Sequence, residues 1–240
     1  CNFSCHVRYG QYIYMIPCTY PAIVRINTED DSIEYFDSWN NNIEYMFRKG
    51  VMVEEDDFYI PSVINNVVLR FNMKECKAYI YNVGEENKGH WSIIKHKEWF
   101  YLTPMLSESV TKWNYINGEI NKLNDLPQDF KGGDFCFSQI YYCNNKMYLI
   151  PARANMGIEI KCENEEVKRW NMEELSDTEE VRCMCNMGKR IFLSIKKNGN
   201  IHHVFINTEN NEVTNVDLYF DESKKKYEKD YFKLINKKHN

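Results

Sequence analysis

The chain of 240 residues is 43% hydrophobic and 27% charged, so it is long enough to bury a substantial core without disulfide or metal support. Its 35 acidic and 30 basic residues are interspersed and give a net charge of -5, which argues against a nucleic-acid partner. No run approaches the roughly 18 apolar residues that span a bilayer, so we predict a soluble globular protein without a membrane span.

Nine cysteines are spread along the sequence without paired CxxC motifs or the spacing of a small disulfide framework. Reduced thiols are therefore expected, and they favour a cytoplasmic location; the alternative is a cell-surface lipoprotein anchored through Cys1. Cys183 and Cys185 would share one face of a strand, with Cys5 at the corresponding place near the N-terminus. That face is expected to pack against other strands, so we predict no metal site.

Five aromatic-aliphatic runs recur along the chain, and the first four end in proline. They are YIYMIP (12–17), FYIP (58–61), FYLTP (100–104), MYLIP (147–151) and IFLSI (191–195). Their last residues are separated by 44, 43, 47 and 44 positions, which indicates an internal repeat. Their β-branched and aromatic composition, bounded by Gly, Asn or Asp, predicts a strand in each run.

Three further strands are predicted in every repeat. The strand before each of these runs is FSCHV (3–7), FRKGV (47–51), WSIIK (91–95), FSQIY (137–141) or VRCMC (181–185). The third strand is AIVRIN, VVLRFN, SVTKWN, GIEIKC or HHVFIN, and the fourth is SIEYF, KAYIY, GEINKL, EEVKRW or NEVTNV. Asn27, Asn72, Asn114 and Asn207 end four of the third strands. Asparagine suits a turn that closes a hairpin, because it tolerates left-handed geometry and bonds its own backbone.

Four short strands repeated at this spacing are typical of a β-propeller. In these residues the chain resembles bacterial β-propeller repeat proteins and, more distantly, the kelch-like group, although it has a single diglycine, Gly132-Gly133, and no WD dipeptide. We predict an all-β fold: one β-propeller domain of four-stranded antiparallel blades over residues 1–240. Its five blades are expected at about 1–40, 41–86, 87–130, 131–176 and 177–221. Residues 222–240 form either an added C-terminal strand on a five-bladed ring or the start of a further blade in a ring of six or seven.

The resemblance to propellers also implies where ligands bind. The first strands of propellers line a central channel, and the loops between second and third strands surround one mouth of it. The channel-lining positions are then Ser4, Arg48, Ser92, Ser138 and Arg182. The loops differ strongly in chemistry between repeats, as expected of recognition on a constant scaffold and equally of loop drift. The candidate contacts are Tyr20, Asn65, Asn66, Ser107, Glu108, Arg153 and Asn155, with Arg48 and Arg182 deeper.

The sequence offers no catalytic constellation. His202 and His203 would point to opposite faces of a strand, no serine and acid are spaced for a hydrolytic triad, and no phosphate-binding loop motif occurs. We therefore predict a non-catalytic interaction module, without a cofactor, that presents one loop face to a protein or peptide partner. The alternative is a glycan- or small-polar-ligand-binding protein or enzyme that uses the channel mouth. This alternative requires Arg48, Arg182 and Glu108 to converge on one concave pocket.

Overall fold

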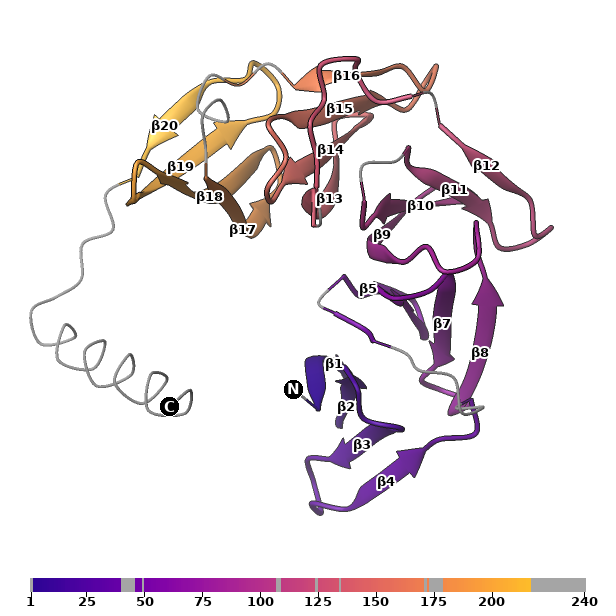
Figure 1. The fold of residues 1–240 in the computed structure, drawn as a ribbon. Coiled ribbons are helices and arrows are strands. Elements are labelled where there is room, and N and C mark those ends of the chain that lie inside the picture. Colours follow the sequence, from indigo (N-terminus) through magenta and orange to yellow (C-terminus); the bar gives the residue numbers. More distant parts are fainter. Residues whose placement is uncertain are drawn as a thin grey trace, which may run out of the picture.

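The computed structural model describes residues 2–39, 46–48, 50–106, 109–123, 125–133, 135–170, 172 and 179–216, without the side chains of 182–184 and 186 (Figure 1). Within these ranges its regular elements are 20 β-strands in five four-stranded sheets, all with antiparallel pairing. The predicted all-β fold of four-stranded blades is thus confirmed. No helix in this described part is long and apolar enough to cross a membrane. Residues 222–240, expected to form a strand or a further blade, lie outside the described ranges.

Each sheet, called a blade below, is a meander in which consecutive strands are neighbours. The first blade contains β1 (Phe3–Tyr9), β2 (Tyr12–Pro17), β3 (Ile23–Asn27) and β4 (Ile33–Phe36). The second contains β5 (Met52–Glu54), β6 (Asp57–Pro61), β7 (Val67–Asn72) and β8 (Lys77–Asn82). The third contains β9 (His90–His96), β10 (Trp99–Pro104), β11 (Thr111–Asn114) and β12 (Ile120–Lys122). The fourth contains β13 (Phe137–Cys143), β14 (Lys146–Pro151), β15 (Gly157–Lys161) and β16 (Val167–Trp170). The fifth contains β17 (Glu180–Met187), β18 (Arg190–Lys197), β19 (Asn200–Asn207) and β20 (Val213–Asn215).

The five blades follow one another around an arc (Figure 1). The strands on the inner side of the arc are β1, β5, β9, β13 and β17. Those on the outer side are β4, β8, β12, β16 and β20. The first strand of every repeat therefore faces the centre of the arc, the arrangement expected of propeller blades around a channel.

Two-residue turns between first and second strands give all five blades an equivalent register. The residues that flank these turns pair as Tyr9–Tyr12, Glu54–Asp57, His96–Trp99, Cys143–Lys146 and Met187–Arg190. Counted from these pairs, Pro17, Pro104, Pro151 and Ile195 share one position. The second blade has Ser62 at that position, so Pro61 comes one residue earlier than the alignment of FYIP with the other runs assumed.

The asparagines that end four of the third strands close turns, as predicted. In each case the side-chain Oδ1 accepts a hydrogen bond from a backbone N–H two or three residues later. The pairs are Asn27 with Glu29 (3.1 Å), Asn72 with Glu75 (2.7 Å), Asn114 with Ile116 (3.0 Å) and Asn207 with Glu209 (2.9 Å). The asparagine side chain thus replaces a backbone partner at the start of the turn between the third and fourth strands.

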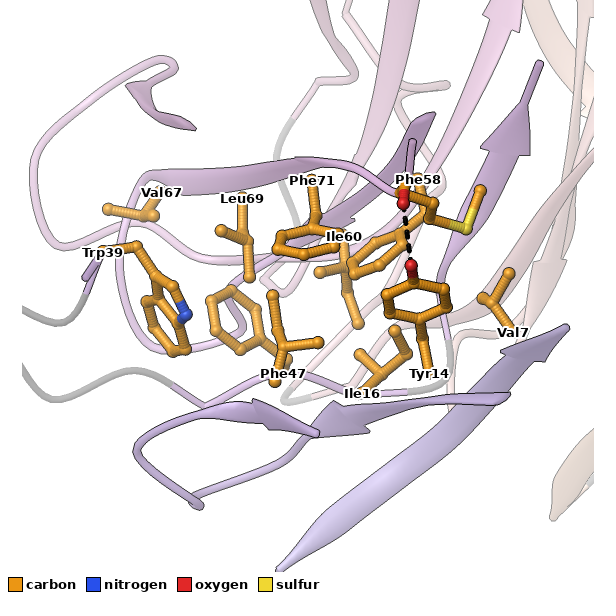
Figure 2. Close-up of a cluster of buried hydrophobic side chains, with 12 residues drawn as sticks. Val7, Tyr14, Ile16, Trp39, Phe47, Phe58, Ile60, Val67, Leu69 and Phe71 are labelled. Atoms are coloured by element: carbon orange, nitrogen blue, oxygen red, sulfur yellow. Dashed lines mark hydrogen bonds between the residues drawn. The ribbon is translucent and has the colours of Figure 1, made fainter. Parts of the chain in front are cut away.

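Buried hydrophobic side chains fill the seams between consecutive blades. At the first seam, Tyr14 and Ile16 of β2 pack against Phe58, Ile60 and Phe71 of the second blade (Figure 2). Comparable clusters join the second blade to the third, the third to the fourth, and the fourth to the fifth. These seams fix the position of each blade relative to the next, and hence the positions of the loops at their ends.

A tyrosine occupies the third residue of the second strand in four blades, at positions 14, 59, 101 and 148. Tyr14 donates a hydrogen bond to the Met73 carbonyl oxygen over 2.7 Å, and Tyr148 donates to the Thr208 carbonyl oxygen over 3.1 Å. Each acceptor lies in the next blade. Burial raises the pKa of Tyr14 to about 12, so this side chain is a neutral donor at physiological pH. In the fifth blade the equivalent residue is Phe192, which has no hydroxyl.

The two ends of the arc differ from its interior. In the second to fifth blades, the residues equivalent to Ile13 are Phe58, Phe100, Met147 and Ile191, and all of them are fully buried against the preceding blade. In the first blade, Ile13 and Met15 are half-buried, and Ile33 and Tyr35 on the same face are 53% and 59% exposed. No hydrophobic cluster of the described residues joins the first blade to the fifth.

Candidate functional site

A repeated backbone clasp organises the ends of the blades where second strands lead into third strands. Met105 shows the pattern: its N–H donates to the Gly89 carbonyl of its own blade over 3.2 Å, and its carbonyl accepts from the Phe135 N–H, which leads into the next blade, over 3.1 Å. Cys18 makes the same two bonds at the first seam, and Ala152 makes them at the fourth. At the second seam they are divided between the N–H of Val63, which donates, and the carbonyl of Ser62, which accepts. Since backbone atoms carry the clasp, the side chains of these loops are left to vary. We call this end of the molecule the loop face.

Two linked concavities lie on the loop face at the third blade. The first has a volume of about 170 Å³ and is lined by Val63, Glu85, Asn87, Lys88, Gly89, His90, Pro104, Met105, Leu106, Ser109, Thr111 and Lys122. The second is wider, about 520 Å³, and is lined by Lys88, Ser109, Lys122, Asp125, Leu126, Pro127, Gln128 and Phe130. Lys88, Ser109 and Lys122 belong to both, so the two form one continuous groove, called the blade-3 groove below.

The inner part of the blade-3 groove has apolar walls and a polar floor. Pro104, Met105 and Leu106 form one wall, and Leu106 is 47% exposed. The floor includes buried His90, whose Nε2 lies 3.1 Å from the Val83 carbonyl oxygen. Gly89 is required beside this floor, because a Cβ there would lie 2.0 Å from the Val63 carbonyl oxygen.

The junction of the two concavities carries a compact charge cluster. Glu85 is ion-paired to Lys88, with a nitrogen–oxygen distance of 2.7 Å, and to Lys122. Lys122, and after it Lys88, lowers the pKa of the Glu85 carboxyl group to about 2. Two ammonium groups against one carboxylate leave one positive charge at this point of the groove.

A second feature lies beside the groove, at the inner strand. Phe135 has a left-handed backbone, with φ of 61°, and its side chain is 39% exposed. Its ring meets the ring of Trp91 edge-on at 5.3 Å, and the guanidinium carbon of Arg153 lies 5.9 Å from its centre. A bulky residue in this conformation is uncommon and stores strain, and such strain often marks a functional site. We call these three residues the aromatic patch.

A β-bulge decides which residue of the third blade joins this patch. The pairing shifts between Thr103 and Pro104, so Trp91 occupies the bulge position that Ser4 and Ser138 hold in their blades. Ser92, predicted to line the channel, is instead buried, with its hydroxyl 2.7 Å from that of Thr103. The sequence alignment matched Ser92 with Ser4 and Ser138, although Ser92 lies 12 residues before its proline and the other two lie 13 before theirs.

Two of the predicted site residues bond to backbone groups of neighbouring loops. Asn155 accepts from the Lys131 N–H over 2.8 Å and donates to the Asp129 carbonyl over 2.9 Å. Asn66 likewise donates to the Gly84 carbonyl over 3.1 Å.

The other predicted residues are dispersed around the loop face. Tyr20 packs on Phe3 at 4.9 Å, Arg48 approaches the Met46 sulfur at 3.5 Å, and Asn65 is half-buried. Arg153 belongs to the aromatic patch. Ser107, Glu108 and the side chain of Arg182 lie outside the described residues. None of the predicted residues with a described side chain lines the blade-3 groove.

One serine–histidine pair was not predicted from the sequence. The Ser194 hydroxyl lies 2.9 Å from Nδ1 of His203, because the two residues are cross-strand partners in the fifth blade. The His203 ring stacks on Phe192 at 5.8 Å. Among the described residues no carboxylate bonds to His203, and no group of three His, Cys, Asp or Glu side chains is arranged to hold a metal ion.

No protein-family model matches the chain, and no curated protein has significant sequence similarity to it. Solved structures do match. Virginiamycin B lyase from Staphylococcus aureus is 13% identical with a TM-score of 0.63, and the match covers 90% of this chain and 70% of that one. The extracellular domain of the putative one component system BT4673 from B. thetaiotaomicron is 11% identical with a TM-score of 0.64, covering 90% and 28%. BamB from Moraxella catarrhalis is 7% identical with a TM-score of 0.58, covering 89% and 63%.

At these identities the likeness concerns the fold alone. The matched structures are β-propeller-like, and the chain has the four-stranded antiparallel blades in an arc that this fold requires. The chain is therefore a β-propeller protein. This fold hosts both enzymes and binding proteins, so function has to be argued from the loop face.

Proposed function

We propose that the chain is a non-catalytic interaction module that presents its loop face to a protein or peptide partner. The observation that carries this proposal is the blade-3 groove. Its inner concavity of about 170 Å³ opens into a wider one of about 520 Å³, which gives the groove a narrow end and a broad, open end. The narrow end suits one side chain of a partner, and the wider concavity beside it leaves room for the residues that follow.

The kind of propeller and its cellular location belong to the same proposal. We propose a bacterial, kelch-like propeller in the cytoplasm, with a lipoprotein held through Cys1 as the alternative. A reducing compartment is supported by Cys18, Cys76, Cys143, Cys162 and Cys185, which are free thiols. Cys185 is exposed, so a membrane-impermeant thiol reagent should label it in intact cells if the protein is at the cell surface, and only after lysis if the protein is cytoplasmic.

The test uses Leu106→Glu, which places a charge in the exposed apolar wall of the groove. The matched control is Ile201→Glu in the fifth blade, where an isoleucine is 65% exposed. Partner recovery from lysate, quantified against the wild-type chain, should fall about tenfold or more for Leu106→Glu and stay unchanged for the control. Equal recovery by both variants, with unchanged thermal unfolding, would show that the groove is not the binding surface.

A second candidate function is recognition of a glycan or another small polar ligand, or catalysis on one, at the channel mouth. The aromatic patch supports it, since Trp91 and Phe135 offer ring faces and Arg153 offers a cation. Titration with oligosaccharides and small carboxylates should then quench tryptophan fluorescence in the wild-type chain and not in Trp91→Phe. Equal quenching in both proteins would remove this candidate.

A further inference from the structure

We infer that the blade-3 groove binds an extended peptide segment in which a large apolar residue stands next to an acidic residue, followed by a neutral or basic one. This inference rests on the proposed function and specifies its partner. Three consecutive parts of the groove carry it: an apolar end, a cationic junction and a polar end.

The apolar end selects the first residue. Val63, Pro104, Met105 and Leu106 supply the apolar side chains that line the inner concavity, whose volume of about 170 Å³ has room for a leucine, methionine or phenylalanine side chain. Leu106 is half exposed at this wall, so a partner side chain would remove both its own apolar surface and that of Leu106 from water. Burial of one such side chain stabilises a complex by about 1.5 to 3 kcal/mol, so it serves as the anchor.

The cationic junction selects the second residue. Lys88 and Lys122 border both concavities, so any chain passing from one to the other crosses them. Glu85 already shows that a carboxylate is held between these two ammonium groups. The junction keeps one positive charge beyond Glu85, and each ammonium group has three donors, so an incoming carboxylate completes the charge balance.

The polar end excludes a second acid. Asp125 lines the wider concavity and is exposed, next to Gln128 and Pro127. A carboxylate placed beside Asp125 is repelled, whereas a neutral or basic residue is accepted. The charges along the groove thus specify an order as well as a composition.

Glu85 distinguishes this arrangement from general attraction between a cation and an acid. Because it occupies the two lysines in the free protein, it competes with the carboxylate of the peptide. Its neutralisation should therefore strengthen binding, which is the opposite of what the loss of an ordinary contact residue does.

The test measures fluorescence anisotropy of labelled nine-residue peptides with the full chain. The parent peptide has a central leucine followed by glutamate and then serine; its variants replace leucine by serine, glutamate by lysine, or the last serine by glutamate. We expect the leucine replacement to lower affinity by about tenfold or more, and each of the two charge changes to lower it by about three- to fivefold.

The protein variants form two matched pairs. Lys122→Gln should weaken binding of the parent peptide about threefold and Glu85→Gln should strengthen it by a similar factor, while Lys189→Gln and Glu209→Gln, from an exposed ion pair of the fifth blade, should change nothing. Binding should weaken as salt is raised. Unfolding midpoints of all four variants confirm that they are folded.

The possible failures are distinguishable. If the peptides bind in the groove with no preference for the acid, or if Glu85→Gln weakens binding, the inference is wrong and the proposed function stands. If inorganic phosphate alone competes and the leucine is irrelevant, the groove is a small-anion site and the inference is wrong. If no peptide binds and Leu106→Glu also leaves partner recovery unchanged, both the inference and the proposed function fail.

Discussion

The seams between blades and the loop face obey different rules. At the seams the same side chain recurs, since a tyrosine stands at the third residue of the second strand in four of five blades. At the loop face the equivalent loops contain Tyr20, Asn65, Leu106 and Arg153, which share no chemistry. Seam side chains must fit a neighbouring blade, whereas backbone bonds hold the clasps of the loop face and leave most side chains there free to differ.

The contrast predicts which substitutions change stability and which change binding. A change at a seam removes packing or a hydrogen bond between two blades, so it lowers the free energy of unfolding. A change at the loop face leaves the clasps in place, so it alters recognition with little effect on stability. Substitutions at the seams should therefore cost more stability than substitutions at the loop face.

The largest effect is expected for Trp170→Ala at the seam between the fourth and fifth blades. Trp170 is buried, its ring lies 4.8 Å from that of Tyr148, and its Nε1 donates to Asn211 over 3.2 Å. Removing it should lower the free energy of unfolding in urea by about 3 to 5 kcal/mol. Tyr35→Ala, in the exposed face of the first blade, is the control and should cost less than about 0.5 kcal/mol.

Gly89→Ala should cause the next largest loss of stability. Gly89 lies where the seam between the second and third blades meets the loop face. The added Cβ would lie 2.0 Å from the Val63 carbonyl oxygen, so the backbone has to shift at a cost of about 1 to 3 kcal/mol, and the groove should lose its affinity for peptide. In Gly118→Ala nothing lies within 4 Å of the new Cβ, and only the left-handed backbone, with φ of 77°, opposes it. Intact peptide binding in Gly89→Ala would contradict the close approach described above.

Tyr148→Phe isolates the recurrent seam hydrogen bond. Loss of the bond to the Thr208 carbonyl should cost about 1 to 2 kcal/mol in urea unfolding, including the buried carbonyl left without this donor. The control is Tyr142→Phe, at a tyrosine that is 37% exposed, and it should cost less than about 0.5 kcal/mol. An equal loss of stability in both variants would contradict a special role of the seam hydrogen bond.

The smallest effect concerns the titration of Glu85 on the loop face. Its carboxyl pKa in the folded chain is about 2, below the ordinary value of 4.5, because Lys122 and Lys88 stabilise the charged form. A lowered folded pKa contributes stability above pH 4.5 and loses it as the pH falls toward 2. Since the group is exposed, the stability change should be near the detection limit, while carbon NMR of its carboxyl group should show the low midpoint. A midpoint near 4.5 would contradict the ion pairs.

The sequence predicted the repeat, the number of strands in each blade and the asparagine turns, because each of these depends on residues close together in the chain. The first strand of the second blade was expected at 47–51, whereas β5 covers Met52–Glu54. The sequence alignment also placed Pro61 one residue out of register and took Ser92 for a channel residue, since the register of a strand is fixed by its pairing partners and not by similar residues in another repeat. The blade-3 groove was not foreseen. Its lining comes from four separate segments, and its key ion pair joins Glu85 to Lys122 across the third blade.

The arc gives the blades unequal resistance to opening. Among the described residues, the first and fifth blades each pack against one neighbour, and the three between them pack against two. In an array whose stability is a sum of nearest-neighbour terms, units with one neighbour open at the lowest free energy. Amide hydrogens of β1–β4 and β17–β20 should therefore exchange with solvent before those of β9–β12. The groove thus sits on one of the three blades that have two neighbours, so its geometry should persist while the blades at the two ends of the described arc open.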